Sequence, residues 1–310
     1  MIRRIILHAG TPKTGTTSLQ LYLAAERELL LQHGILYPRF GTTGDQFKPK
    51  HQWLVESLHS RFGGELHRKI TEAVREADVS THTLVLSSEG LFHHWQDFST
   101  AGRRALAALA RDFHVEIWVW FRDPISFVQS NYIQMLRNPL SRNVFCYGKD
   151  LSPEEMLKDP WFARQLDYMG FVSDAEQVVG NGAVRPFSYT GDTIRAFCDA
   201  LGIAGAQRPI SRSNPAFGAL AVELLRILNR RDLGRDKERA VKIIATLDAA
   251  RTERQPFTIS PAVTRTIQDI CLPGLRVLEA KFGLYLHASQ NSDGLIGQFE
   301  SYQEHTEPLS

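Results

Sequence analysis

A short segment near the start of the chain, Gly10-Thr11-Pro12-Lys13-Thr14-Gly15-Thr16-Thr17, combines two glycines, a lysine and adjacent threonines. It follows an apolar run over 2–8 that predicts a buried strand and precedes a run over 18–34 with helical spacing. In such a context, backbone N–H groups and the positive end of the helix bind one anionic group, most often a phosphate. The glycines have the spacing of the phosphate-binding loop G-x-x-x-x-G-K-[ST], but Thr16 replaces its lysine and Lys13 lies inside the loop. An ordinary strand-to-helix turn with an N-capping threonine is the alternative.

A second element suited to an anion follows the apolar strand predicted over 114–121. Arg122 ends this strand, and Ser130 comes eight residues later in a helix predicted over 124–137. Ser126 and Ser130 are four residues apart and therefore share one helix face. Arginine offers a planar fork for phosphate, and a hydroxyl can bind a neighbouring oxygen. The alternative is a surface ion pair between Arg122 and Asp123, with Ser130 only a small helix residue.

Other residues of interest are aromatic or titratable. Glu89 ends a predicted strand in THTLVLSSEG (81–90), where it would face the same cleft as the loop; the alternative is that it caps the following helix or pairs with an arginine. His51, His59 and His67 recur every eight residues, which indicates a solvated helix face rather than a metal site. Three aromatic residues could form an apolar or sugar-stacking wall, although their spacing is more typical of a core: Trp53, Phe92 and Trp95.

The remaining pattern predicts the elements that must position these residues. A further strand is expected over 181–187, and helices over 51–78, 100–112, 193–202, 216–230, 236–251 and 260–282. Because strands alternate with helices, we expect right-handed crossovers and an α/β fold with a mainly parallel central sheet flanked by helices. The prediction is a single domain over 1–290 with a helical C-terminal third, followed by an acidic, flexible tail over 291–310.

Composition limits the classes of function. The 310 residues carry 36 Lys and Arg against 34 Asp and Glu, a net charge of +2, with 43% hydrophobic and 23% charged residues. These values are those of a globular protein and argue against a general binder of nucleic acid or membrane surfaces. The tail holds four of the acids and no Lys or Arg, which leaves +6 on residues 1–290.

The cysteines and the apolar runs bear on the compartment. Cys146, Cys198 and Cys271 are an odd number without C-x-x-C spacing, which indicates free buried thiols. The apolar run at the N-terminus is too short for a signal peptide, and no run of eighteen apolar residues indicates a transmembrane helix. We therefore expect a soluble, cytoplasmic protein.

Together, the two anion-binding elements resemble those of sulfotransferases that use 3′-phosphoadenosine 5′-phosphosulfate (PAPS). TPKTGTTSLQ resembles the 5′-phosphosulfate loop of that family, P-K-x-G-T-T-x-L, and FRDPISFVQSNY resembles its 3′-phosphate element. Three later segments are similar to parts of bacterial carbohydrate-type members, although less specifically: LVLSSEGL, VRPFSYTGDTIRAFCDALGI and SNPAFGALAVELLRILNR. The resemblance spans about residues 2–230, with the motifs in the order of the family.

The resemblance implies a fold related to P-loop nucleotide kinases and a reaction that needs no metal. By position, Lys13, Thr14, Gly15, Thr16 and Thr17 would hold the 5′-phosphosulfate. Arg122 and Ser130 would hold the 3′-phosphate. Lys13 would also stabilise the oxygen of the leaving group.

The general base is expected to be Glu89, because members that modify glycans often use a glutamate, while cytosolic small-molecule members use a histidine. His93 and His94 are the rival bases. Two departures from the family stand out. Phe187 occupies a position where many members have tyrosine, which puts an adenine contact there in doubt. No Arg-Lys-Gly loop is found, and Arg212 or Arg251 would have to substitute.

The expected function is therefore transfer of a sulfuryl group from PAPS to a hydroxyl of a carbohydrate or related small molecule. No nucleic-acid partner and no stable membrane insertion are expected. Two alternatives remain at this point. One is a P-loop kinase or NTPase, and the other is a non-catalytic nucleotide-binding protein of the same fold.

Overall fold

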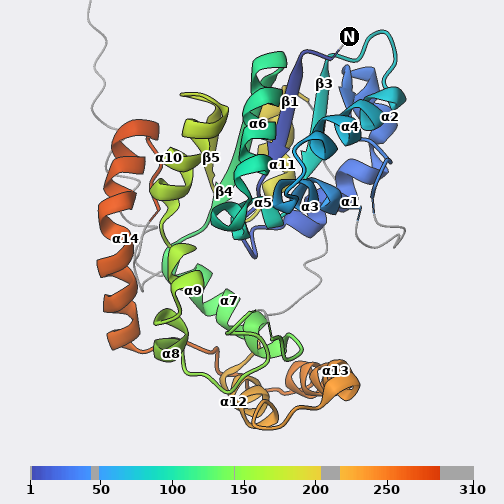
Figure 1. The fold of residues 1–310 in the computed structure, drawn as a ribbon. Coiled ribbons are helices and arrows are strands. Elements are labelled where there is room, and N and C mark those ends of the chain that lie inside the picture. Colours follow the sequence, from blue (N-terminus) through green and yellow to red (C-terminus); the bar gives the residue numbers. More distant parts are fainter. Residues whose placement is uncertain (1, 43–48, 143, 204–216, 287–310) are drawn as a thin grey trace, which may run out of the picture.

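Five parallel strands form the central sheet in the computed structural model, which describes residues 2–42, 49–142, 144–203 and 217–286. The strands are β1 (Arg4–His8), β2 (Ile35–Leu36), β3 (Thr83–Ser87), β4 (His114–Phe121) and β5 (Val184–Ser188). Their order is β2-β3-β1-β4-β5, so the first strand lies in the middle of the sheet (Figure 1). The predicted α/β fold with a parallel sheet is confirmed.

The register of the strands brings the predicted site segments to one edge of the sheet. At the end of β1, His8 pairs with Ser87 of β3 on one side and with Trp118 of β4 on the other. Since all strands run in the same direction, the loops that follow β1, β3 and β4 leave from the same carboxyl edge. Ligands of open α/β sheets collect at this edge.

Successive side chains of the strands point to opposite faces, and different helices cover each face. Ile6, Val85 and Trp120 pack with α1 (Thr16–Ala25), α2 (Arg27–Gln32) and α11 (Thr193–Leu201). Ile5, Leu84 and Val119 belong to the larger core on the other face, beneath α3, α6 and α10. The sheet is therefore covered on both sides, as expected for parallel strands.

The other helices follow in chain order. They are α3 (Gln52–His59), α4 (Gly64–Ala73), α5 (Gly90–His93), α6 (Thr100–Asp112), α7 (Pro124–Arg137), α8 (Pro153–Leu157), α9 (Pro160–Arg164), α10 (Tyr168–Val179), α12 (Ala219–Leu228), α13 (Lys237–Ala249) and α14 (Pro261–Phe282), with 3₁₀ turns η1 (Val74–Glu76), η2 (Trp95–Asp97) and η3 (Gly234–Asp236). The predicted helical C-terminal third corresponds to α12, α13 and α14. The predicted tail over 291–310 lies outside the described residues.

Some predicted elements are divided in the structure. The helix predicted over 18–34 breaks at Glu26 into α1 and α2, and the one predicted over 51–78 becomes α3, α4 and η1. Gly63 and Gly64 stand at the second break, and glycine disfavours a helix interior. β2 was not predicted because two residues are too short to show a period. No element was predicted over 138–180, where α8, α9 and α10 lie.

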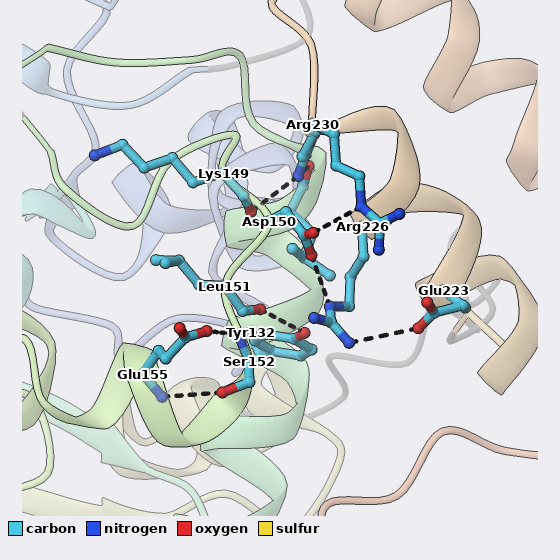
Figure 2. Close-up of polar contacts among 11 residues, drawn as sticks. Tyr132, Lys149, Asp150, Leu151, Ser152, Glu155, Glu223, Arg226 and Arg230 are labelled. Atoms are coloured by element: carbon cyan, nitrogen blue, oxygen red, sulfur yellow. Dashed lines mark hydrogen bonds and ion pairs between the residues drawn. The ribbon is translucent and has the colours of Figure 1, made fainter.

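A polar cluster attaches α12 to the segment between α7 and α8 (Figure 2). Asp150 accepts hydrogen bonds from Arg226 Nε at 2.9 Å and from Arg230 Nε at 3.0 Å. On α7, the Tyr132 hydroxyl donates to the carbonyl of Leu151 at 2.8 Å. These contacts fix the C-terminal helices to α7, which also carries part of the predicted site.

Candidate active site

The loop after β1 leaves the N-terminus of α1 open. The N-cap residue is Gly15, at φ 76°, and it has no side chain that could accept a hydrogen bond from the first turn. An N-capping threonine, the alternative weighed for this loop, is therefore absent at this helix. Lys13, at φ 66°, is the one non-glycine residue with positive φ in the described part of the chain. A left-handed lysine is strained, and such strain is typical of functional loops.

Threonine hydroxyls hold the loop in this conformation. Thr11 Oγ1 donates to the carbonyl of Trp120 on β4 at 2.7 Å, and Thr14 Oγ1 donates to the carbonyl of Thr11 at 2.7 Å. From α11, the hydroxyl of Thr193 donates to the carbonyl of Thr14. Thr193 was not predicted, since its sequence position gives no sign that α11 meets the loop. The loop is thus fixed from both β4 and α11.

The hydroxyl of Thr16 is the best-placed group for an anion at the open helix end. Its Oγ1 atom is buried and has no hydrogen-bond partner within the described chain. A Cβ atom at Gly10 would lie 2.1 Å from this oxygen, so the first glycine makes room for the hydroxyl. A buried, unpartnered donor is costly, and a hydrogen-bond acceptor brought to this hydroxyl would remove the cost. Thr17 is exposed on the first turn.

The structure brings Arg122 and α7 to the same loop. An Arg122 guanidinium N–H donates to the carbonyl of Lys13 at 3.3 Å, and the Lys13 ammonium donates to Gln134 Oε1 at 2.9 Å. Ser130 is one turn before Gln134 on α7 and so shares the face that meets the loop. Directly after Arg122, the Asp123 carboxylate accepts a hydrogen bond from the Ser126 N–H and caps α7, which fixes the start of this helix beside the loop.

Lys13 lies in a cationic environment. Burial lowers its pKa, the charges of Arg137 and Arg122 lower it further, and the charge of Glu89 raises it. Arg137 was not predicted, although it is seven residues after Ser130 and therefore on the same side of α7. Its Nε atom is buried without a hydrogen-bond partner among the described residues, and its guanidinium lies 5.0 Å from the centre of the Phe217 ring. Three cations thus surround the loop.

Glu89 lies where the sequence analysis placed it, at the carboxyl end of β3. It occupies the N-cap position of α5, but its side chain makes no capping hydrogen bond. Its charge acts on Lys13 and also raises the pKa of Tyr147. The carboxylate is half-buried and close to the loop, and the capping role does not describe it.

The histidines have separate environments. His93 is one turn after Glu89, and burial and the charge of His94 lower its pKa to about 3, so its imidazole is neutral. His94 lies 3.5 Å from Asp97. His51 is buried, receives a hydrogen bond from the Ser87 N–H at Nδ1, and donates to the Pro38 carbonyl. Only His59 and His67 are exposed, so the predicted solvated face describes two of the three histidines that recur every eight residues.

The other residues singled out from the sequence lie in the core or away from the loop. Trp53, Phe92, Trp95 and all three cysteines are buried. Phe187 stacks on Trp120 with ring centres 4.3 Å apart. Two residues further along the chain, the guanidinium of Arg122 lies over the ring of Tyr189. Arg251 is exposed after α13, without a contact to the loop among the described residues, and Arg212 lies outside them.

The described residues contain no group of three or more His, Cys, Asp or Glu side chains placed to hold a metal ion. None of their helices combines the length and the apolar character needed to cross a membrane.

The fold is similar to that of a known enzyme. A crystal structure of a sulfotransferase from Alicyclobacillus acidocaldarius superposes with a TM-score of 0.50, covering 92% of this chain and 98% of that protein, at 14% sequence identity. At this identity the similarity establishes a shared fold. No protein-family model and no curated protein matches the sequence.

Proposed function

We propose that the protein is a sulfotransferase that uses PAPS as the sulfuryl donor and a hydroxyl of a carbohydrate or related small molecule as the acceptor. One observation carries the proposal: the loop after β1 and the Arg122 element adjoin, joined by the hydrogen bond from Arg122 to the Lys13 carbonyl. Two adjoining anion-binding elements fit a nucleotide with two separate phosphate groups. The fold shared with a sulfotransferase supports the same conclusion.

The residues at the loop fit the 5′ end of such a nucleotide. The open N-terminus of α1 and the Thr16 hydroxyl provide donors for phosphate oxygens, and Lys13, Thr14, Gly15 and Thr17 complete the cradle. Arg122 and Ser130 would hold the 3′-phosphate from the side of β4 and α7. Arg137 adds a further positive charge that acts on Lys13. When bound, PAPS supplies a sulfuryl group and a nucleotide leaving group.

The protein contributes position and charge to the transfer. Lys13 is placed to stabilise the oxygen that gains charge as the sulfur–oxygen bond breaks. Glu89 accepts the proton of the acceptor hydroxyl as its oxygen attacks sulfur. Because sulfuryl transfer resembles phosphoryl transfer, with a loose in-line transition state, holding donor and acceptor in line is the larger part of catalysis.

Nucleotide binding tests the proposal and its two alternatives. By calorimetry, we expect adenosine 3′,5′-bisphosphate to bind at least about tenfold more tightly than adenosine 5′-monophosphate, since only the former engages Arg122 and Ser130. Tighter binding of ATP with Mg²⁺ would instead favour a P-loop kinase or NTPase. Transfer of ³⁵S from labelled PAPS to a panel of acceptors distinguishes the enzyme from a non-catalytic nucleotide-binding protein.

A further inference from the structure

A chain of two side-chain hydrogen bonds links Lys13 to the end of α7. The Lys13 ammonium donates to Gln134 Oε1 at 2.9 Å. From the other end of the same amide, Gln134 Nε2 donates to Asn138 Oδ1 at 2.7 Å. Asn138 is the C-cap residue of α7. The side chain of Lys13 is therefore connected to a fixed point at the end of this helix.

The chemistry of its two neighbours fixes the orientation of the Gln134 amide. An ammonium group can only donate hydrogen bonds, so the atom of Gln134 that faces Lys13 must be the oxygen. The nitrogen then faces Asn138, whose side-chain oxygen accepts its hydrogen bond. The backbone N–H of Asn138 also donates to the Gln134 carbonyl at 3.0 Å, which holds the two residues together. Turning the amide over would break both side-chain hydrogen bonds.

Gln134 lies on the face of α7 that carries other residues of the candidate site. It is four residues after Ser130 and three before Arg137, so these three share one side of the helix. The charge of Arg137 acts on Lys13, in agreement with this placement. Because Arg122 donates to the Lys13 carbonyl at 3.3 Å, the backbone and the side chain of Lys13 are held separately.

The charges around Lys13 act in opposite directions. Burial lowers its pKa, and the charges of Arg137 and Arg122 lower it further. The charge of Glu89 raises it. Lysine carries its charge on a flexible four-carbon stem, and charge–charge forces are not directional. The hydrogen bond to Gln134 is directional, so it selects one position for the ammonium.

The acceptor that holds Lys13 is an amide and not a carboxylate. A carboxylate in its place would balance the charge of Lys13 and repel an anion at the loop. A neutral amide holds the ammonium and leaves its charge available to a ligand. The bond to Gln134 uses one of the three N–H groups of an ammonium, so the others can donate to ligand oxygens.

We propose that Gln134 is a positioning residue for Lys13: its neutral amide holds the ammonium where it meets the leaving-group oxygen of the bound donor, and Asn138 fixes the orientation of that amide. The inference rests on the proposed sulfotransferase function, because it concerns how Lys13 acts in that reaction. A misplacement of about 1 Å can cost roughly 10²-fold in rate. The position of Lys13 should therefore affect the rate more than the affinity.

Steady-state rates with labelled PAPS and the best acceptor of the panel provide the first test. Gln134→Met removes the amide but keeps the length of the side chain. We expect kcat to fall about tenfold, because the ammonium loses its fixed position. The KM for PAPS should change less than about threefold, because the charge of Lys13 remains. Gln129→Met is the matched control, since Gln129 is also half-buried on α7 but donates to the Phe257 carbonyl. It should retain the wild-type kcat.

A double-mutant cycle separates positioning from a general effect on the fold. In Lys13→Met there is no ammonium to hold, so adding Gln134→Met should cause no further loss of kcat. An equal loss of kcat from Gln134→Met with and without Lys13 would overturn the inference. Asn138→Leu should lower kcat in the wild type but not in Gln134→Met, and a loss in both would remove Asn138 from the proposal.

Titration of the Lys13 ammonium by NMR tests the contact in the free protein, without turnover. The other charges that act on this group, those of Arg137, Glu89 and Arg122, are the same in every variant. Gln134→Glu should raise the pKa of Lys13, because a negative charge replaces a neutral amide. Gln134→Met should lower it, because the charged form loses an acceptor, and Gln129→Met should not change it. An unchanged pKa in Gln134→Glu would contradict the contact and the inference with it.

The outcomes distinguish this inference from the proposed function. A protein that binds adenosine 3′,5′-bisphosphate and transfers ³⁵S, but has the same kcat as Gln134→Met, loses only the inference. A protein that neither binds this nucleotide nor transfers ³⁵S loses the proposed function, and this role of Gln134 with it. If Gln134→Met does not fold, Gln134→Glu decides, because its added charge should weaken binding of the nucleotide about tenfold. Unchanged affinity in Gln134→Glu would then overturn the inference.

Discussion

Two groups of cationic side chains in this molecule differ in the partners that their charges have. Around Asp150, Arg226 and Arg230 both donate to one carboxylate, and Arg226 also lies 3.5 Å from Glu223 (Figure 2). Around the loop after β1, Lys13 donates to an amide oxygen and Arg122 to a carbonyl. Neither Arg122 nor Arg137 forms a salt bridge with any residue that the structure describes.

The difference lies in where each group of cations finds its opposite charge. A cation whose charge is balanced by a neighbouring carboxylate has its electrostatic partner within the chain. Three adjacent, half-buried cations repel one another, and the charge of Glu89 offsets only part of this repulsion at Lys13, because Arg137 and Arg122 both lower the pKa that Glu89 raises. A bound polyanion removes the remaining repulsion. If the proposed function is right, the Asp150 cluster serves stability and the Lys13 cluster serves nucleotide binding, and mutations should separate the two.

The largest effect is expected for Lys13→Met. Loss of the charge that stabilises the leaving group should reduce sulfuryl transfer about 10³-fold, with weaker binding of the nucleotide. Lys237→Met is the control, because Lys237 is a buried lysine that is hydrogen-bonded to Asn229 and remote from the loop in sequence. Rates from labelled PAPS measure both variants. Equal losses of the transfer rate in the two variants would contradict a specific role of Lys13 in the reaction.

Glu89→Gln should have the next largest effect. The substitution keeps the size and polarity of the side chain but removes the base, so turnover should fall roughly 10²-fold while nucleotide affinity is nearly unchanged. His94→Asn, one of the rival bases, should change turnover far less. Steady-state rates and calorimetry on the same samples provide the measurement. A larger loss of turnover in His94→Asn than in Glu89→Gln would identify His94, not Glu89, as the general base.

Arg137→Met compares the two clusters directly. The substitution should weaken the binding of adenosine 3′,5′-bisphosphate about tenfold, because a charge-assisted contact to phosphate is lost. Arg226→Met in the Asp150 cluster should leave this affinity unchanged and instead lower the free energy of unfolding by about 1 kcal/mol, as for a partly exposed ion pair. Calorimetry and urea titrations test the two variants. The assignment fails if both lose affinity or both lose only stability.

The smallest effect concerns pH. Burial and the neighbouring arginines lower the pKa of Lys13 in the free protein, whereas a bound anion raises it. Nucleotide binding is then coupled to protonation of Lys13, so affinity for adenosine 3′,5′-bisphosphate should fall as pH rises from 7 to 10. Lys13→Met should remove this Lys13-dependent part of the decline, while Lys237→Met should retain it. Identical profiles for wild type and Lys13→Met would show that Lys13 does not face the nucleotide.

The sequence predicted those features that depend on local spacing. The loop at 10–17 was predicted from two closely spaced glycines and a pair of adjacent threonines. The strand predicted over 114–121 has the same bounds as β4. Arg137 and Thr193 were not predicted because their roles depend on contacts between elements distant in sequence.

The hydrogen bond from Thr193 to the Thr14 carbonyl has a consequence for biosynthesis. It joins residues 179 positions apart, so the loop gains its support from α11 only after more than half of the chain has been made. At 5–20 residues per second, the ribosome takes roughly 10–40 s to cover that interval. During this time β5 has not yet joined the sheet and the edge of β4 stays unpaired. A nascent chain shorter than about 200 residues therefore lacks the completed loop after β1.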